Sequence, residues 1–170
     1  GARPEAMSPS IDPAPKRRLL FICTGNICRS PTAEVVFSAL MRAKNLQSEF
    51  EVDSAGTHGY HTGAGADPRS AEHAGKRDYD LSAHRARPVD MQDFERFDHL
   101  LAMDDDNMQW LRARCPSAFR DKLSYFLEHC PALGMREVPD PYYGGDQGFE
   151  RVLDLCESAA AALLSKLRPT

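Results

Sequence analysis

The stretch that decides the fold is Leu19-Leu20-Phe21-Ile22-Cys23-Thr24-Gly25-Asn26-Ile27-Cys28-Arg29-Ser30-Pro31-Thr32-Ala33-Glu34. It opens with a short apolar run typical of a buried strand and passes through a turn that contains glycine and asparagine. It then reaches Ser30-Pro31, where a hydroxyl cap precedes a proline suited to the first position of a helix. The stretch therefore predicts a strand, a tight loop and a helix. In such a unit the loop amides converge beside the positive end of the helix dipole and hold a phosphate or another tetrahedral anion.

Two side chains give this predicted anion site its chemistry. Cys23 stands at the carboxyl end of the strand, where N–H groups and a nearby guanidinium favour thiolate over thiol and so make it a nucleophile. Arg29 closes the loop with a planar fork of donors that can bind two phosphoryl oxygens at once. A nucleotide-binding loop would need a lysine before the Ser/Thr and a longer run bounded by glycines. The spacing Cys-x5-Arg-Ser therefore indicates covalent phosphoryl transfer to sulfur.

The rest of the loop supplies the expected cradle. Asn26 tolerates left-handed backbone geometry and is expected to fix the shape of the loop. Ser30 is expected to donate a hydrogen bond to the Cys23 thiolate, so that the sulfur leaves readily in a second step. The phosphate-binding amides are those of Thr24, Gly25, Asn26, Ile27, Cys28 and Arg29. Since these groups and the guanidinium stabilise the charge, we expect no metal and no cofactor.

Composition bounds the class of protein. The chain has 170 residues, 42% of them apolar, and a formal net charge of −4, which suits one globular domain and argues against a nucleic-acid partner. No apolar run approaches the roughly 20 residues that span a bilayer, and the first residues lack the apolar core of a signal peptide. Five cysteines without framework spacing fit reduced thiols and no zinc site. We therefore expect a cytoplasmic monomer without a membrane partner.

The order of elements predicts an α/β fold. Residues 1–15 carry four prolines and almost no apolar periodicity, which predicts a disordered tail before a single domain at 16–170. After the first strand, expected strands lie at 50–54, 97–103 and 123–127, and expected helices at 31–44, 67–76, from 104 to before Pro116, and 149–167. This alternation predicts a three-layer sandwich, with a four-stranded parallel sheet, helices on both faces, and the phosphate loop at the carboxyl end of the first strand. Ser54, near the end of the second strand, is a candidate to brace that loop or to make only a local turn bond.

A second stretch with chemical content is Val138-Pro139-Asp140-Pro141-Tyr142-Tyr143. An acid between two prolines is held in an extended, stiff conformation, which limits the movement of its carboxyl group. Loss of a phenolate from phosphorus is helped by a positioned acid, and the resulting carboxylate can then take a proton from the attacking water. Asp140 is therefore the candidate general acid and base. Tyr142 and Tyr143 are candidates to stack on a substrate ring.

With these residues in place, the chain resembles the low-molecular-weight protein tyrosine phosphatases. The resemblance runs from residue 16 to near the carboxyl end, in the order and at about the spacing of that family. It rests on residues 23–31, Asp53-Ser54-Ala55-Gly56-Thr57, Asp67-Pro68-Arg69, Ala83-His84-Arg85-Ala86-Arg87, Met103-Asp104 and Asp140-Pro141-Tyr142-Tyr143-Gly144. It implies a phosphotyrosine-containing protein substrate and a cysteinyl-phosphate intermediate.

The resemblance also implies roles for residues that the sequence alone leaves open. It makes His84 a hydrogen-bond partner of the phosphate loop and Asp104 a supporting residue near the site. It makes Tyr60, on the glycine-rich loop 56–66, a wall of the active site, and the tyrosines at 142 and 143 possible phosphorylation targets. Without it, Tyr60 is equally a surface tyrosine on a loop.

Three other readings compete. Arsenate reductases share the fold and the loop but need a closely spaced cysteine pair, which Cys115, Cys130 and Cys156 do not provide. A phosphoarginine phosphatase would carry a small polar residue in place of Ile27, whose side chain favours an aromatic substrate. A phosphopeptide-binding module without catalysis would not need both the cysteine and the aspartate. We also predict that peroxide joins Cys23 to Cys28 in a reversible disulfide that protects the nucleophile.

Overall fold

The computed structural model describes residues 15–143 and 145–168, with no side-chain description for Tyr143. The predicted tail lies outside these ranges except for Pro15. The strands are β1 (Arg17–Cys23), β2 (Phe50–Gly56), β3 (His99–Ala102) and β4 (Leu123–Tyr125). The α-helices are α1 (Arg29–Ala43), α2 (Pro68–Gly75), α3 (Asp93–Arg96), α4 (Asp105–Arg114) and α5 (Asp146–Leu167). Short 3-10 helices are η3 (Ser117–Lys122), η4 (Phe126–His129), η5 (Pro131–Leu133) and η6 (Pro141–Tyr143).

The four strands form one parallel sheet in the order β2-β1-β3-β4. The strand β1 therefore lies between two neighbours, and its last residue, Cys23, pairs with Gly56 at the end of β2. The predicted four-stranded parallel sheet is confirmed. Because all strands run the same way, the loops that follow β1, β2 and β3 meet at one edge, where ligands of such sheets bind.

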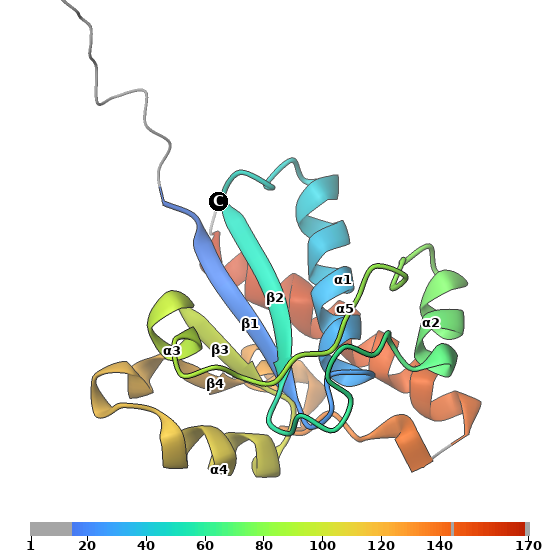
Figure 1. Cartoon of the computed structure of the whole chain (residues 1–170). Coiled ribbons are helices and arrows are strands. Elements are labelled where there is room, and N and C mark those ends of the chain that lie inside the picture. The colour runs from blue at the N-terminus through green and yellow to red at the C-terminus, as the bar shows by residue number, and fades with distance from the viewer. Residues whose placement is uncertain (1–14, 144, 169–170) are drawn as a thin grey trace, which may run out of the picture.

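Alternate residues of β1 enter two separate hydrophobic clusters. Leu19 and Phe21 pack with α1 and α5, whereas Leu20 and Ile22 pack with α3 and α4. This is the two-residue period of a strand that is covered on both faces. Figure 1 shows the resulting layers, with α1 and α5 on one side of the sheet and α4 on the other. The three-layer sandwich predicted from the order of elements is therefore confirmed.

Several element boundaries differ from those predicted. The strand β2 continues to Gly56. The strand β3 is shorter than expected because Phe97 is the C-cap of the unpredicted helix α3 and does not join the sheet. The strand β4 ends at Tyr125, since Phe126 and Leu127 are both buried and turn into η4. Strand alternation cannot bury two consecutive side chains on one face, so the chain leaves the sheet there.

The start of α1 is a correction to the sequence analysis. The helix begins at Arg29, its N-cap is Cys28, and no side chain caps it. Ser30 is therefore not a cap residue. Its hydroxyl group lies against the sulfur of Cys23, as expected from the sequence, and the helix starts two residues earlier than the Ser-Pro pair predicts. The predicted cap at α2 is confirmed, since the Asp67 side chain accepts from the amides of Arg69 and Ser70.

Candidate active site

The loop between β1 and α1 is held by its carbonyl groups. The carbonyls of Cys23 and Thr24 accept from the amides of Thr57 and His58 at 2.9 and 3.0 Å, and the carbonyl of Ile27 accepts from Asp67 N at 2.9 Å. These partners all lie outside the loop. Carbonyls that bond outward leave the opposite side of the backbone, with its N–H groups, facing the cavity.

Asn26 organises the loop from its centre. It is fully buried and adopts a left-handed backbone conformation with φ of 58°, as the sequence predicted. Its Nδ2 donates to Ser30 Oγ at 2.9 Å and to Ser54 Oγ at 3.0 Å. Its Oδ1 accepts from Arg87 N at 2.9 Å. One side chain therefore ties the loop to the first turn of α1, to β2 and to the segment that passes over the edge of the sheet.

Cys23 lies at the floor of the loop with its side chain almost fully buried. The Asn26 amide donates to Sγ at 3.3 Å, and Ser30 Oγ lies 3.0 Å from the same sulfur. Since the Ser30 oxygen already accepts from Asn26, its single proton is free to point at the sulfur. Both contacts stabilise a thiolate better than a thiol.

Arg29 turns its guanidinium back toward the loop. Its Nη1 donates to Asp104 Oδ2 at 2.6 Å and to the Val138 carbonyl at 3.0 Å, and its side chain is only 3% exposed. Burial lowers and the neighbouring Cys23 and Asp104 raise the pKa of Arg29, with a net increase, so the guanidinium stays charged. The sequence did not predict the Val138 carbonyl as a partner, because a backbone group 109 residues away carries no local signal.

Asp140 reaches the same cavity from the far end of the chain. Its Oδ2 lies 3.7 Å from Arg29 Nη2, and its Oδ1 accepts from Tyr142 N at 2.9 Å. The side chain is 44% exposed, so the carboxyl group lies at the rim and not at the floor. The structure thus places the predicted nucleophile, guanidinium and acid around one space.

That space is a cavity of about 370 Å³. It is lined by Cys23, Thr24, Gly25, Ile27, Cys28, Arg29, Tyr60, His61, Asp140 and Tyr142. Tyr60 is 78% exposed and stacks on His58 with ring centroids 5.1 Å apart, so it stands at the mouth of the cavity. The side chain of Tyr143, which was also predicted to line the site, lies outside what the structure describes. His61 was not predicted; its ring lies so near Gly25 that a Cβ at residue 25 would approach Cδ2 to 3.0 Å.

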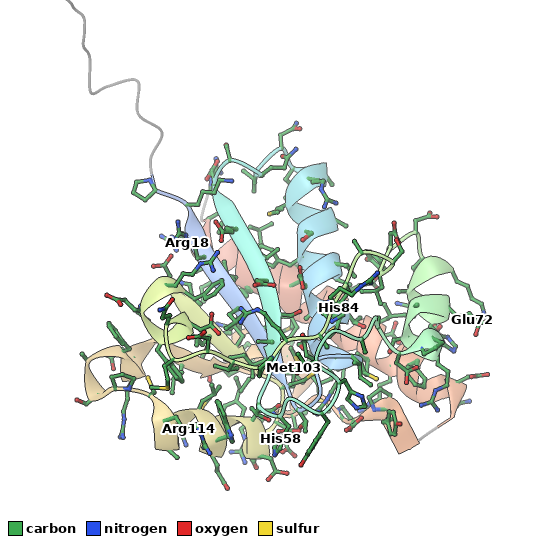
Figure 2. All side chains as sticks on the ribbon, in the orientation of Figure 1. Arg18, His58, Glu72, His84, Met103 and Arg114 are labelled. Carbon is green, nitrogen blue, oxygen red and sulfur yellow. The ribbon has the colours of Figure 1, made fainter. Side chains whose placement is uncertain are left out.

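The three supporting residues lie next to the loop. Ser54 Oγ accepts from Asn26, as described, and Asp104 both binds Arg29 and caps α4 by accepting from Asn107 N at 2.8 Å. His84 Nε2 lies 2.6 Å from the carbonyl oxygen of Asn26. Because a carbonyl only accepts, Nε2 carries the proton in this contact. Burial lowers the pKa of His84, and Figure 2 shows its place beside the loop and α1.

Glu34 extends this network and was missed by the sequence analysis. Ser54 Oγ donates to Glu34 Oε1 at 2.7 Å. Burial raises the pKa of Glu34 from 4.5 to about 7, against the opposing effect of the Ser54 hydrogen bond. A local signal was present, since Ser30 and Glu34 are four residues apart and share a face of α1. Its meaning depends on β2, which brings Ser54 to that face.

The remaining features of the described residues concern metal binding, membrane-spanning helices and the other cysteines. In the ranges 15–143 and 145–168, no three His, Cys, Asp or Glu side chains are grouped to hold a metal ion. None of the helices described there is long and apolar enough to cross a membrane. Burial raises the pKa of Cys28 to about 12 and also raises the pKa values of Cys115 and Cys156.

Known proteins are similar to this chain in fold and sequence. A crystal structure of a protein tyrosine phosphatase from Entamoeba histolytica superposes with a TM-score of 0.87 at 43% identity, covering 89% of this chain and 97% of that one. A putative low molecular weight protein-tyrosine-phosphatase of Synechocystis is 44% identical over 88% of this chain and 96% of its own length. A low molecular weight protein-tyrosine-phosphatase of Streptomyces coelicolor is 43% identical, over 89% and 93%.

Fold and relatives together define the class: the chain is a protein-tyrosine-phosphatase, a hydrolase that acts on phosphoproteins. The family model described as low molecular weight phosphotyrosine protein phosphatase matches residues 18–170. The chain belongs to that family, and the resemblance stated from the sequence is confirmed.

Proposed function

We propose that this phosphatase hydrolyses phosphotyrosine in two steps through a cysteinyl-phosphate, with Asp140 as acid and then base. The observation that carries the proposal is the placement of Cys23 at the floor and Asp140 at the rim of one cavity, which Arg29 also lines. A nucleophile and a proton donor on opposite sides of the reacting group are what an in-line displacement needs.

In the first step the Cys23 thiolate attacks phosphorus, the S–P bond forms and the P–O bond to the phenol breaks. Asp140 gives its proton to the departing oxygen. In the second step Asp140 takes a proton from water, the water oxygen attacks phosphorus, and the S–P bond breaks to release phosphate and the thiolate. Arg29 and the loop amides stabilise the charge on the phosphoryl oxygens in both steps. Ser30 stabilises the sulfur anion as it leaves.

The walls of the cavity support an aromatic substrate. Ile27, Tyr60 and Tyr142 line it, so a phenyl ring that enters between them would be covered by apolar and aromatic surface. A serine phosphate has no ring to fill that space. We therefore propose phosphotyrosine in proteins as the substrate.

One assay tests the mechanism and the substrate together. Phosphate release is measured from a phosphotyrosine peptide, a phosphoserine peptide and phosphoarginine, for the parent, Cys23→Ser and Asp140→Ala. We expect turnover of the phosphotyrosine peptide only, no turnover by Cys23→Ser, and a loss of about 100-fold or more in Asp140→Ala. Unchanged turnover in Cys23→Ser would refute the covalent mechanism, and activity confined to phosphoarginine would refute the substrate.

We also propose that the site is redox-sensitive. Peroxide would oxidise the Cys23 thiolate to a sulfenic acid, and the Cys28 thiol would attack that sulfur, forming the S–S bond and releasing water. Both cysteines line the same cavity. Burial raises the pKa of Cys28 to about 12, so its thiol gives up the proton only as it attacks, and the proton leaves with the sulfenic oxygen as water. We expect peroxide-treated parent to recover activity with dithiothreitol and Cys28→Ser to recover much less. Equal recovery would refute the disulfide.

A reducing compartment fits this chemistry. All five cysteines are free, and the mechanism requires Cys23 as a thiolate. On that ground we propose a cytoplasmic location, and we propose a monomer as the active form. Fractionation of cells and light scattering of the purified protein test the two statements.

A further inference from the structure

The first turn of α2 lies between the phosphate loop and the loop that carries Asp140. On one side, Asp67 N donates to the Ile27 carbonyl of the phosphate loop at 2.9 Å. On the other side, Arg69 Nη2 donates to the Tyr142 carbonyl at 2.9 Å. Two residues of one helical turn therefore connect the floor of the site to its rim, although Ile27 and Tyr142 are far apart in the sequence.

The Arg69 side chain is held in this position by several contacts. Its Nε and Nη2 lie 3.4 and 3.3 Å from the two carboxylate oxygens of Asp67. Its guanidinium carbon lies 5.5 Å from the centre of the Tyr142 ring and 4.8 Å from that of Phe149, the latter buried in α5. The hydrogen bonds to Asp67 raise the pKa of Arg69, so the donor remains charged. A planar guanidinium can serve a carboxylate, a carbonyl and two rings at once, which an ammonium cannot.

The backbone of Tyr142 connects Arg69 to the proposed acid, Asp140. The Tyr142 backbone is hydrogen-bonded on both sides of its Cα atom, because its carbonyl accepts from Arg69 and its amide donates to Asp140 Oδ1 at 2.9 Å. The other oxygen of Asp140 faces Arg29 across 3.7 Å. Since Asp140 is 44% exposed, packing alone does not hold its carboxyl group. The amide of Tyr142 sets its orientation, and Arg69 sets the position of that residue.

We propose that Arg69 is a positioning residue for Asp140: it holds the Tyr142 backbone so that the Asp140 carboxyl group points over the phosphate loop. This inference rests on the proposed function, in which Asp140 protonates the leaving group. A structural role limited to joining α2 to α5 would instead lower stability and leave proton transfer unchanged.

The test uses the dependence of kcat/KM on the leaving group. 4-Nitrophenolate leaves without a proton, whereas phenolate, with a pKa of about 10, needs the acid. We would measure kcat/KM for 4-nitrophenyl phosphate and phenyl phosphate in the parent, Arg69→Met, Arg69→Lys, Asp140→Asn and the double variant Arg69→Met/Asp140→Asn. The matched control is Arg114→Met. Arg114 also lies over an aromatic ring, Trp110, and donates to a backbone carbonyl, but on α4, at the opposite side of the molecule in Figure 2 from Glu72 on α2.

We expect Arg69→Met to lower kcat/KM for phenyl phosphate about tenfold more than for 4-nitrophenyl phosphate, since small misplacements of a catalytic group are costly. Asp140→Asn should show the same selectivity at about 100-fold or more. The kcat/KM for phenyl phosphate in Arg69→Lys should lie between the values for the parent and Arg69→Met. Arg114→Met should have the kcat/KM of the parent for both substrates. In the Asp140→Asn background, Arg69→Met should change the ratio of the two substrates by less than about twofold, because the acid on which it acts is gone.

The outcomes separate the two proposals. Suppose that Asp140→Asn lowers kcat/KM more for phenyl phosphate than for 4-nitrophenyl phosphate. If Arg69→Met then lowers kcat/KM equally for both substrates, or lowers only the melting temperature, Arg69 is not a positioning residue. Arg69 is also not a positioning residue if Arg69→Met still changes the ratio of kcat/KM for the two substrates about tenfold in the Asp140→Asn background. If Asp140→Asn shows no selectivity, Asp140 is not the acid, and the proposed function and this inference fail together.

Discussion

The hydroxyl oxygen of Ser30 lies 3.0 Å from the sulfur of Cys23, and the same oxygen accepts a hydrogen bond from Asn26. The hydroxyl proton has two acceptors within reach, the sulfur and, at 3.5 Å, the Ala55 carbonyl oxygen. In the proposed mechanism, the bond to the sulfur stabilises the leaving thiolate. We expect Ser30→Ala to lower kcat about 100-fold, as removal of one donor to a developing anion does. The loss should fall on hydrolysis of the phosphoenzyme, so rapid mixing with 4-nitrophenyl phosphate should show a burst followed by slow turnover.

The control for this prediction is Ser38→Ala. Ser38 is a buried serine on the same helix, α1, and has no contact with Cys23 among the hydrogen bonds of the described residues. Its kcat should stay within about twofold of the parent. Parent-like turnover in Ser30→Ala, without a burst, would contradict the role of the hydroxyl group.

Asn26 and Asn45 both have φ of 58°, but only Asn26 is buried and bonded through its side chain to other elements. Asn45→Ala should cost about 1 kcal/mol, the penalty of left-handed backbone for a residue with a Cβ. Asn26→Ala should cost about 3 kcal/mol, because it also leaves buried partners without hydrogen bonds. Urea unfolding of both variants checks the difference. Equal losses would show that the side-chain network adds no stability.

The Asp104 carboxylate accepts hydrogen bonds from two places: the guanidinium of Arg29 and the backbone amide of Asn107 at the N-terminus of α4. Asp104→Ser keeps a capping oxygen and removes the carboxylate, whereas Asp104→Ala removes both. We therefore expect the serine variant to be more stable than the alanine variant by about 1 kcal/mol. Both should lose about tenfold or more in kcat/KM, since Arg29 is no longer oriented. Activity restored by serine would show that the cap, and not the carboxylate, matters to catalysis.

Glu34 predicts a pH dependence of stability. Its pKa is raised to about 7 in the folded protein, while in the unfolded chain it is near 4.5. Between these values the folded state keeps a proton that the unfolded state has lost, so the free energy of unfolding falls as the pH rises from about 4.5 to 7. Glu34→Gln retains an oxygen that accepts from Ser54 and does not titrate.

Relative to the parent, Glu34→Gln should therefore gain about 2 kcal/mol between pH 5 and pH 8, after allowance for solvent screening of a half-buried carboxyl group. Urea unfolding at the two pH values measures this gain. Glu137→Gln is a control, because Glu137 is exposed. A difference between parent and Glu34→Gln that does not change with pH would contradict the raised pKa.

Much of the site could be predicted because its central part is continuous in sequence. Local patterns predicted the strand and the turn, and they placed the start of the helix two residues too late. Asp140 was predicted because two prolines flank it, which is again a local signal. Partners at long range were expected only from the family resemblance, as for His84 and Asp104. The Val138 carbonyl, 109 residues from Arg29, was not predicted.

By itself, the sequence predicted the strand, loop and helix that carry Cys23 and Arg29, and it determined the alternation that gives a parallel sheet covered on both faces. Only the tertiary structure decided that Ser30 is not the cap of α1, and that Glu34 accepts a hydrogen bond from Ser54 beside the loop. The tertiary structure also explains why residue 56 is glycine, since a Cβ there would lie 2.7 Å from the Thr24 carbonyl oxygen. The physical reason is the range of the interactions: backbone propensity acts between neighbours in the chain, whereas hydrogen-bond partners and steric limits at the site are set by elements that meet only when the sheet assembles.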